Sequence, residues 1–176
     1  MPLDGTPGQP TPIDAALLPL RLVHAAMVFS VLVYAVVVHF AIREQGETPV
    51  DGPDLMLPLA FAALVAGLAA PVMRRVLMPP RRPPTSLREP PPTHVPPRHF
   101  ARAFTAWIVS WAACEAVTVL GLVLAFLLRR PSAFYPFAAG ALLLFAFLAP
   151  RRADLEAVAR AAAPAEDGPE QDSLGP

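Results

Sequence analysis

One acidic residue lies inside a long apolar stretch of this chain. Glu115 is the only formally charged residue between Ala103 and Leu128, a segment long enough to cross a bilayer. A charge at the centre of a membrane helix costs at least ~2.5–3.5 kcal/mol on insertion scales, so an acid at this depth points to a functional site. The chemistry open to a lone carboxyl group here is the binding and release of a proton or a cation.

Three hydroxyl-bearing residues are candidate partners for Glu115. Thr118 follows it by three residues and shares its face if the segment is helical. Ser30 and Tyr34 lie near mid-depth in the first apolar segment, so depth alone brings them within reach. No arginine lies inside any apolar segment to neutralise the carboxyl group. We therefore expect it to be protonated at neutral pH, unless a cation or a water-filled pocket compensates.

The elements that must position these residues are apolar helices. The chain has 176 residues, of which 55% are hydrophobic and only 16% are charged, whereas soluble domains average about 25% charged residues. We predict an all-α membrane protein with four transmembrane helices arranged as two antiparallel hairpins. The predicted spans are about 22–42, 55–73, 103–128 and 133–149.

Polar segments surround and connect the predicted hairpins. Proline blocks helices and favours extended polyproline II, so the Pro-rich segment between the hairpins is expected to act as a stiff spacer. The predicted organisation is a disordered Pro-rich cytoplasmic tail (1–19), hairpin 1 (20–78), a basic Pro-rich cytoplasmic linker (79–102), hairpin 2 (103–149) and a cytoplasmic tail with a short helix followed by disorder (150–176).

The distribution of arginine predicts the orientation. All 14 basic residues are arginine, and the lack of lysine beside abundant alanine and proline indicates a high-GC, bacterial source. With both termini inside, the tails and the linker carry eleven arginines and the opposite side carries three, namely Arg43, Arg129 and Arg130. The positive-inside rule then predicts a bacterial cytoplasmic (inner) membrane protein with an N-in, C-in topology.

Small residues predict where helices approach closely. Ala112 and Ala116 have the small-xxx-small spacing beside Glu115, which favours contact with another helix in lipid. Gly67, four residues after Ala63, has the same spacing in the second span. Gly121 is the corresponding small residue further along the third span.

The residues after Glu115 carry a family resemblance. The stretch from Glu115 to Ala125 reads EAVTVLGLVLA and resembles the ion-binding helix of the proteolipid c subunit of rotary ATP synthases. That resemblance implies that Glu115 corresponds to the ion-carrying carboxylate and Gly121 to the glycine six residues later. It covers about 25 of the 176 residues, and neither the first nor the second span has the repeated Gly-x-Gly pattern of that family's first helix.

The sequence gives little indication of enzymatic, cofactor or metal chemistry. The chain lacks a phosphate-binding loop, a dinucleotide fingerprint, a nucleophile elbow and a zinc-protease motif, so we predict no enzymatic activity, no cofactor and no metal. The single cysteine, Cys114, is expected to be a packed side chain. His24 and His39 are about 22 Å apart along one helix, so they cannot share a ligand and are expected at opposite interfaces. Trp107 is expected in an aromatic belt and Trp111 in helix packing.

Two functions remain in competition. In the preferred interpretation, the protein is a non-catalytic accessory or assembly protein whose protonated Glu115 fixes helix packing. In the alternative, it is a proton- or cation-translocating component in which Glu115 carries the ion, assisted by Thr118, Tyr34 and Ser30. The expected partners are the lipid bilayer and either a second copy or another membrane subunit; nothing indicates nucleic acid.

Overall fold

The structure is a computed structural model that describes residues 12–45, 53–78 and 95–162. Helices make up 92% of these residues, and no strand occurs among them, which confirms the predicted all-α fold. The elements are α1 (Pro12–Gln45), α2 (Pro53–Leu77), α3 (Pro97–Leu128), the 3-10 turn η1 (Pro131–Ala133), α4 (Tyr135–Phe147) and α5 (Arg152–Ala162).

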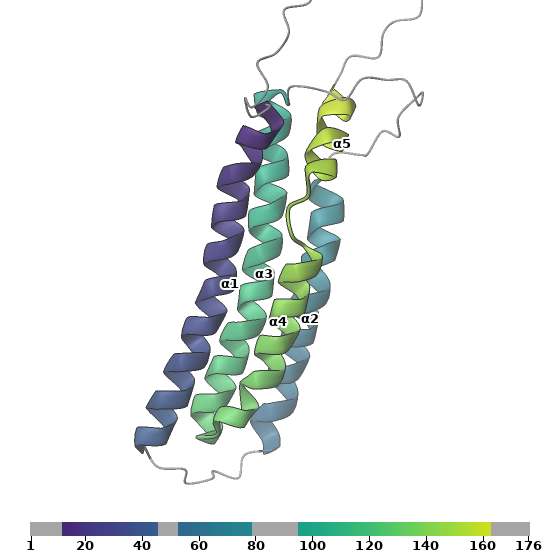
Figure 1. Ribbon diagram of the computed structural model, residues 1–176. Coiled ribbons are helices and arrows are strands. Elements are labelled where there is room, and N and C mark those ends of the chain that lie inside the picture. Colours follow the sequence, from purple (N-terminus) through teal and green to yellow (C-terminus); the bar gives the residue numbers. More distant parts are fainter. Residues whose placement is uncertain (1–11, 46–52, 79–94, 163–176) are drawn as a thin grey trace, which may run out of the picture.

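Helices α1 to α4 run along an elongated bundle, and α5 lies at one end of it (Figure 1). The start of α1, the end of α2, the start of α3 and all of α5 meet at this end, which we call the α5 end. α3 is the central helix, because it packs against every other helix, whereas α1 and α2 do not touch each other within the described residues. The two helices of the first predicted hairpin run antiparallel (Figure 1), but in the part of the chain that the structure describes they do not pack against each other. They lie on different sides of α3.

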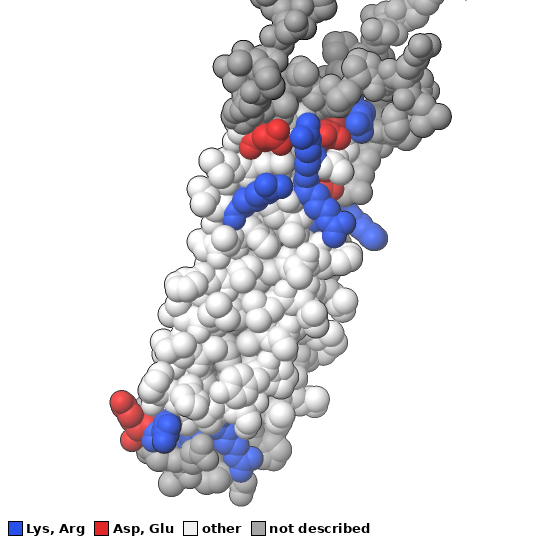
Figure 2. Space-filling model, viewed as in Figure 1, with Lys and Arg blue, Asp and Glu red and all other residues white. Residues whose placement is uncertain are grey.

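The bundle has the charge pattern of a membrane protein. α1, α2 and α3 are each long and apolar enough to cross a membrane, and α4 with α5 passes the same test as a pair bent by 50°. Figure 2 shows charged side chains at the two ends and an uncharged band between them. Arg21 and Arg43 bound this band on α1, and their spacing of 22 residues corresponds to ~33 Å of helix. A hydrocarbon core is about 30 Å thick, so the band matches it.

Helices α1 and α3 begin earlier than predicted. The sequence predicted disorder through residue 19 and a linker through residue 102, but α1 is helical from Pro12 and α3 from Pro97. Proline is well suited to the first helical turn, because its missing N–H has no partner there in any case. Ile13, Leu17 and Leu20 follow at helical spacing and are buried. The prediction was wrong for these turns because proline-rich composition does not reveal burial by a distant helix.

The fourth predicted span, 133–149, is shorter and broken. α4 has 13 residues, ends at Phe147, and is followed by a non-helical stretch that includes Pro150. The predicted short helix after it exists as α5, which is amphipathic. Leu155 and Val158 are buried against the bundle, while Arg152 and Glu156 pair on its outer side.

Some predictions concern residues outside the described part of the chain. These are the predicted disorder of residues 1–11 and 163–176 and the stiff spacer over residues 79–94.

Candidate functional site

Glu115 meets two hydroxyl groups of α1. The Tyr34 hydroxyl donates a hydrogen bond to Glu115 Oε1 over 3.0 Å, and Ser30 Oγ lies 3.1 Å from the same oxygen. Ser30 and Tyr34 are four residues apart, so they lie on one face of α1 and reach one carboxyl oxygen together. All three side chains are half-buried. The structure thus brings together three of the four residues that the sequence analysis assigned to an ion or proton site.

The Ser30 hydroxyl has two oxygen atoms within hydrogen-bond distance. Ser30 Oγ also lies 2.7 Å from the carbonyl oxygen of Met27. A hydroxyl group has one hydrogen, so Ser30 cannot donate to both this carbonyl and Glu115. The contact with Met27 lies within one turn of α1, whereas the contact with Glu115 joins α1 to α3.

Thr118 is not part of this cluster. Its side chain is completely buried, and its Oγ1 has no hydrogen-bond partner among the described residues. The predicted hydrogen bond to Glu115 is therefore wrong. Side chains three residues apart on an α-helix differ in direction by about 60°, and Thr118 makes no hydrogen bond within the described residues.

The predicted packing residues divide into two groups. A Cβ built on Gly121 would lie 2.4 Å from Cβ of Phe137 in α4, so only glycine permits this approach. A Cβ on Gly67 would lie 3.3 Å from Leu144 Cδ1 and 3.7 Å from Val117 Cγ2. Ala112 and Ala116, in contrast, are exposed and do not pack inside the bundle. The predicted close packing of these two alanines against another helix is therefore wrong within a single chain, because both lie on an exposed face of α3.

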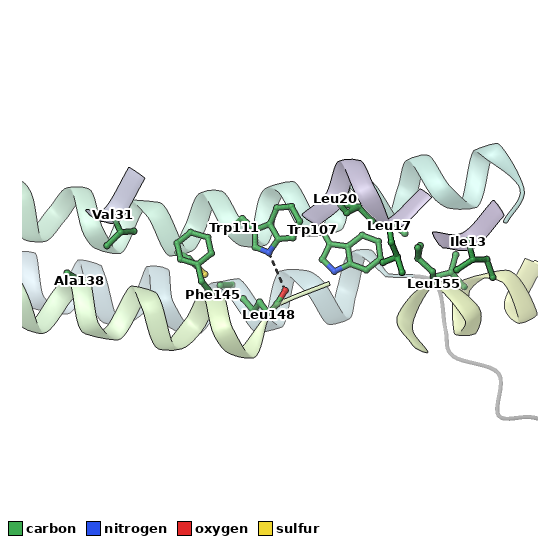
Figure 3. Close-up of a cluster of buried hydrophobic side chains, with 14 of the residues drawn as sticks. Ile13, Leu17, Leu20, Val31, Trp107, Trp111, Ala138, Phe145, Leu148 and Leu155 are labelled. Atoms are coloured by element: carbon green, nitrogen blue, oxygen red, sulfur yellow. Dashed lines mark hydrogen bonds between the residues drawn. The ribbon is translucent and has the colours of Figure 1, made fainter. Parts of the chain in front are cut away.

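Two side chains from other helices bond the carbonyl groups at the broken end of α4, and one of them is Trp111, which was predicted to take part in helix packing. The indole Nε1–H of Trp111 donates to the carbonyl oxygen of Leu148 over 3.2 Å (Figure 3). His24 Nε2 lies 3.0 Å from the carbonyl oxygen of Phe145. Carbonyl groups left unpaired at a helix end are costly in an apolar interior. His24, predicted as an interfacial imidazole, thus has a partner inside the bundle. Its ring is half-buried and lies 5.2 Å from that of Trp111.

A salt bridge at the α5 end was also missed. Arg74 of α2 bonds Asp154 of α5 over 2.6 Å, and both side chains are nearly buried. The Arg74 guanidinium also lies 5.9 Å from the centre of the Trp107 ring, which is completely buried. Trp107 is thus a core residue and not part of a lipid-facing belt as predicted. The only feature of the sequence that pointed to this salt bridge was Asp154, an acidic residue near the start of a short amphipathic helix.

The side chains that meet at Glu115 are hydrogen-bonding groups. Among the described residues, no group of three or more His, Cys, Asp or Glu side chains could hold a metal ion. Cys114, next to Glu115, is buried and not in a disulfide. The groups that meet Glu115 are hydroxyls, which exchange hydrogen bonds with a carboxyl group in either protonation state.

Comparisons with protein-family models, with curated protein sequences and with solved structures found no match to this chain. The resemblance of the Glu115 segment to the ATP synthase c subunit therefore has no support from these comparisons. The helices define an all-α protein of the multi-pass membrane class.

Proposed function

We propose that this protein is a non-catalytic accessory or assembly protein of a membrane, in which Glu115 is a neutral acid that links α1 to α3. The observation that supports this function is the sharing of one carboxyl oxygen by two hydroxyl groups of α1, at 3.0 and 3.1 Å. These contacts join two different helices.

The environment of the carboxyl group supports a packing role. Among the described residues, no salt bridge reaches Glu115, so its partners are neutral. Hydrogen bonds between membrane helices stabilise by ~0.6 kcal/mol on average and up to about 1.7 kcal/mol. A cluster of two such bonds is enough to fix how α1 is rotated against α3.

The partner in this proposal is a second copy or another membrane subunit. Ala112 and Ala116 are exposed next to the Glu115 cluster and present small-xxx-small spacing to the lipid. Changing both residues to leucine would block a close helix approach there. Chemical crosslinking in native membranes should then lose any oligomer that the wild-type chain forms, while the chain still folds.

The proposed location is a bacterial cytoplasmic membrane with both termini inside. The α5 end gathers the start of α1 and the end of α2, and most arginines of the chain belong to this end or to the segment between α2 and α3. Labelling of single cysteines placed near residues 21 and 130, in a Cys114→Ala background, would test this orientation from outside intact cells.

One observation favours the alternative, a proton- or cation-translocating component. The buried Thr118 hydroxyl, on the same helix as Glu115, has no hydrogen-bond partner among the described residues and is a second polar group that an ion or a water molecule could use. In this alternative, Glu115 carries the ion and Ser30 and Tyr34 release it when α1 moves.

A Glu115→Gln variant distinguishes the two functions. Glutamine keeps the shape and most of the hydrogen bonding of a neutral acid, since its amide oxygen can accept from Tyr34, but it cannot titrate. In proteoliposomes under a proton or sodium gradient, we expect the wild type and the variant to leak no faster than protein-free vesicles. We also expect their thermal unfolding temperatures to agree closely. A wild-type flux that disappears in a normally folded Glu115→Gln variant would overturn the packing function.

A second measurement checks whether the carboxyl group is accessible. A hydrophobic carbodiimide reacts with protonated carboxyl groups that face lipid. Because Glu115 is half-buried and bonded to α1, we expect slow labelling in the wild type and faster labelling when Ser30→Ala and Tyr34→Phe are combined. Equal labelling of both proteins would contradict a stable link between α1 and α3.

A further inference from the structure

An apolar groove runs along the outside of the bundle between α2 and α4. It has a volume of about 650 Å³ and opens to the surface. Two glycines, Gly67 and Gly140, lie in its lining, and a Cβ added to Gly140 would meet no described atom within 4 Å. Leu68, Leu143 and Phe147 are exposed along it. The missing side chain of Gly140 leaves space that no described neighbour fills, whereas Leu144 and Val117 pack close to Gly67.

The length of the groove matches one leaflet of a bilayer. Its lining on α4 extends from Pro136 to Phe147, and on α2 from Ala63 to Pro71. At 1.5 Å per residue, these stretches are about 16 and 12 Å long. Half of a hydrocarbon core is ~15 Å thick. An acyl chain that enters from one surface would therefore fill the groove along its length.

Two exposed arginines lie where the groove approaches the α5 end. Arg75 is one helical turn beyond Pro71, so it continues the stripe of α2 that lines the groove. Arg151 comes four residues after Phe147, just past the end of α4. The Arg74–Asp154 salt bridge ties the residue before Arg75 to α5, so both arginines belong to the same end of the molecule. Figure 2 shows basic side chains at this boundary of the uncharged band.

We propose that this groove is a binding site for an anionic phospholipid, with an acyl chain between α2 and α4 and the phosphate held by Arg75 and Arg151. Charge complementarity selects this occupant. Guanidinium groups bind phosphate oxygens through paired hydrogen bonds, whereas an apolar helix of a second copy would leave both cations without a counter-charge. The site does not depend on the function of Glu115, which faces α1.

Lipid retention in native mass spectrometry tests the proposal. The full-length protein is purified in detergent, mixed with phosphatidylglycerol or phosphatidylcholine, and the bound fraction is measured. Each basic residue near an anionic lipid contributes about fivefold in affinity, so Arg75→Gln with Arg151→Gln should weaken phosphatidylglycerol binding roughly thirtyfold. Phosphatidylcholine binding should change little. The matched control is Arg21→Gln with Arg98→Gln, which removes the same charge from α1 and the start of α3 and should retain the lipid.

A groove variant tests the acyl chain separately. Gly140→Leu fills the groove without touching the arginines, and it should reduce the binding of both lipids while glycerol phosphate fails to compete in the wild type. Thermal unfolding in detergent alone checks that each variant is folded. The proposal is overturned if the two arginine pairs behave alike, if glycerol phosphate displaces the lipid, or if Gly140→Leu instead dissociates a dimer.

Discussion

The two sides of α3 are held by different kinds of contact. Toward α1, the contact at mid-depth is a hydrogen-bonded cluster of Glu115, Ser30 and Tyr34. Toward α4, it is a close approach in which Gly121 lies directly against Phe137. In lipid, helices gain no hydrophobic energy by associating, so hydrogen bonds and small-residue packing are the two means available. At Glu115 and at Gly121, this protein uses one of them toward α1 and the other toward α4.

The difference matters because the two contacts tolerate change differently. Packing against a glycine depends on the absence of atoms, so any larger side chain forces the helices apart. A hydrogen-bonded cluster depends on the presence of particular atoms, so it is weakened in steps as each partner is removed. The contact of α3 with α1 is therefore the one that single substitutions should weaken gradually.

The largest expected effect is on the close approach. Gly121→Leu puts a side chain where a Cβ alone would be 2.4 Å from Phe137. Overpacking typically costs about 1–3 kcal/mol, and we expect the upper end here because a helix has to move. The free energy of unfolding in detergent, from titration with SDS, measures this loss. Gly140→Leu is the matched control, and a similar loss there would show that any leucine in these helices destabilises the bundle.

A smaller effect is expected when the carboxyl group is removed. Glu115→Ala leaves two half-buried hydroxyls without this partner, which should cost about 1–2 kcal/mol of unfolding free energy. Glu115→Gln should cost less than ~0.5 kcal/mol, since the amide replaces the neutral acid. The same SDS titration compares the two variants. Equal losses for Glu115→Ala and Glu115→Gln would mean that the hydrogen bonds of residue 115 do not stabilise the protein. The two sides of α3 would then not differ in the proposed way.

The next prediction concerns the hydroxyl groups. Tyr34→Phe and Ser30→Ala should each cost ~0.6 kcal/mol, the average for a hydrogen bond between membrane helices. A double-mutant cycle with Glu115→Ala should show that these losses disappear when the carboxyl group is absent. Tyr135→Phe, at an exposed tyrosine at the start of α4, is the control. If the losses are additive, each hydroxyl group stabilises the protein through contacts other than its hydrogen bond to Glu115.

The smallest effect is expected at Gly67. An added Cβ would lie 3.3 Å from Cδ1 of Leu144, the flexible end of a side chain that can move. Gly67→Ala should therefore change the unfolding free energy by less than ~0.5 kcal/mol, because the gain in helix propensity offsets the tight contact. Gly140→Ala should be stabilising by up to about 1 kcal/mol for the same reason. Thermal unfolding of both variants, measured side by side, checks the order.

Depth along the helices was a good guide to the candidate site, whereas rotation around them was not. Ser30 and Tyr34 were chosen because they lie at the depth of Glu115, and both contact it. Thr118 and Ala112 were chosen by spacing along α3, and neither has the predicted contact. Depth follows from counting residues, but the direction of each face depends on which helices pack around α3.

Contacts between segments that are far apart in the chain were also not predicted from the sequence. The partners Arg74 and Asp154 are 80 residues apart in the chain, and His24 and Phe145 are 121 apart. No local pattern of residues links such pairs. The early start of α1 has the same origin, since Ile13 and Leu17 are buried together with Leu155 of α5 (Figure 3).

The sequence by itself determined that this is an all-α protein with an uncharged band as thick as a bilayer and one acid within it. These properties follow from the length and polarity of single segments, because each helix satisfies its own backbone hydrogen bonds. The tertiary structure alone decided that α3 is central, that α4 ends early and that Glu115 faces α1. Those outcomes depend on side-chain shape and hydrogen bonding between helices, which are defined only after the helices have packed.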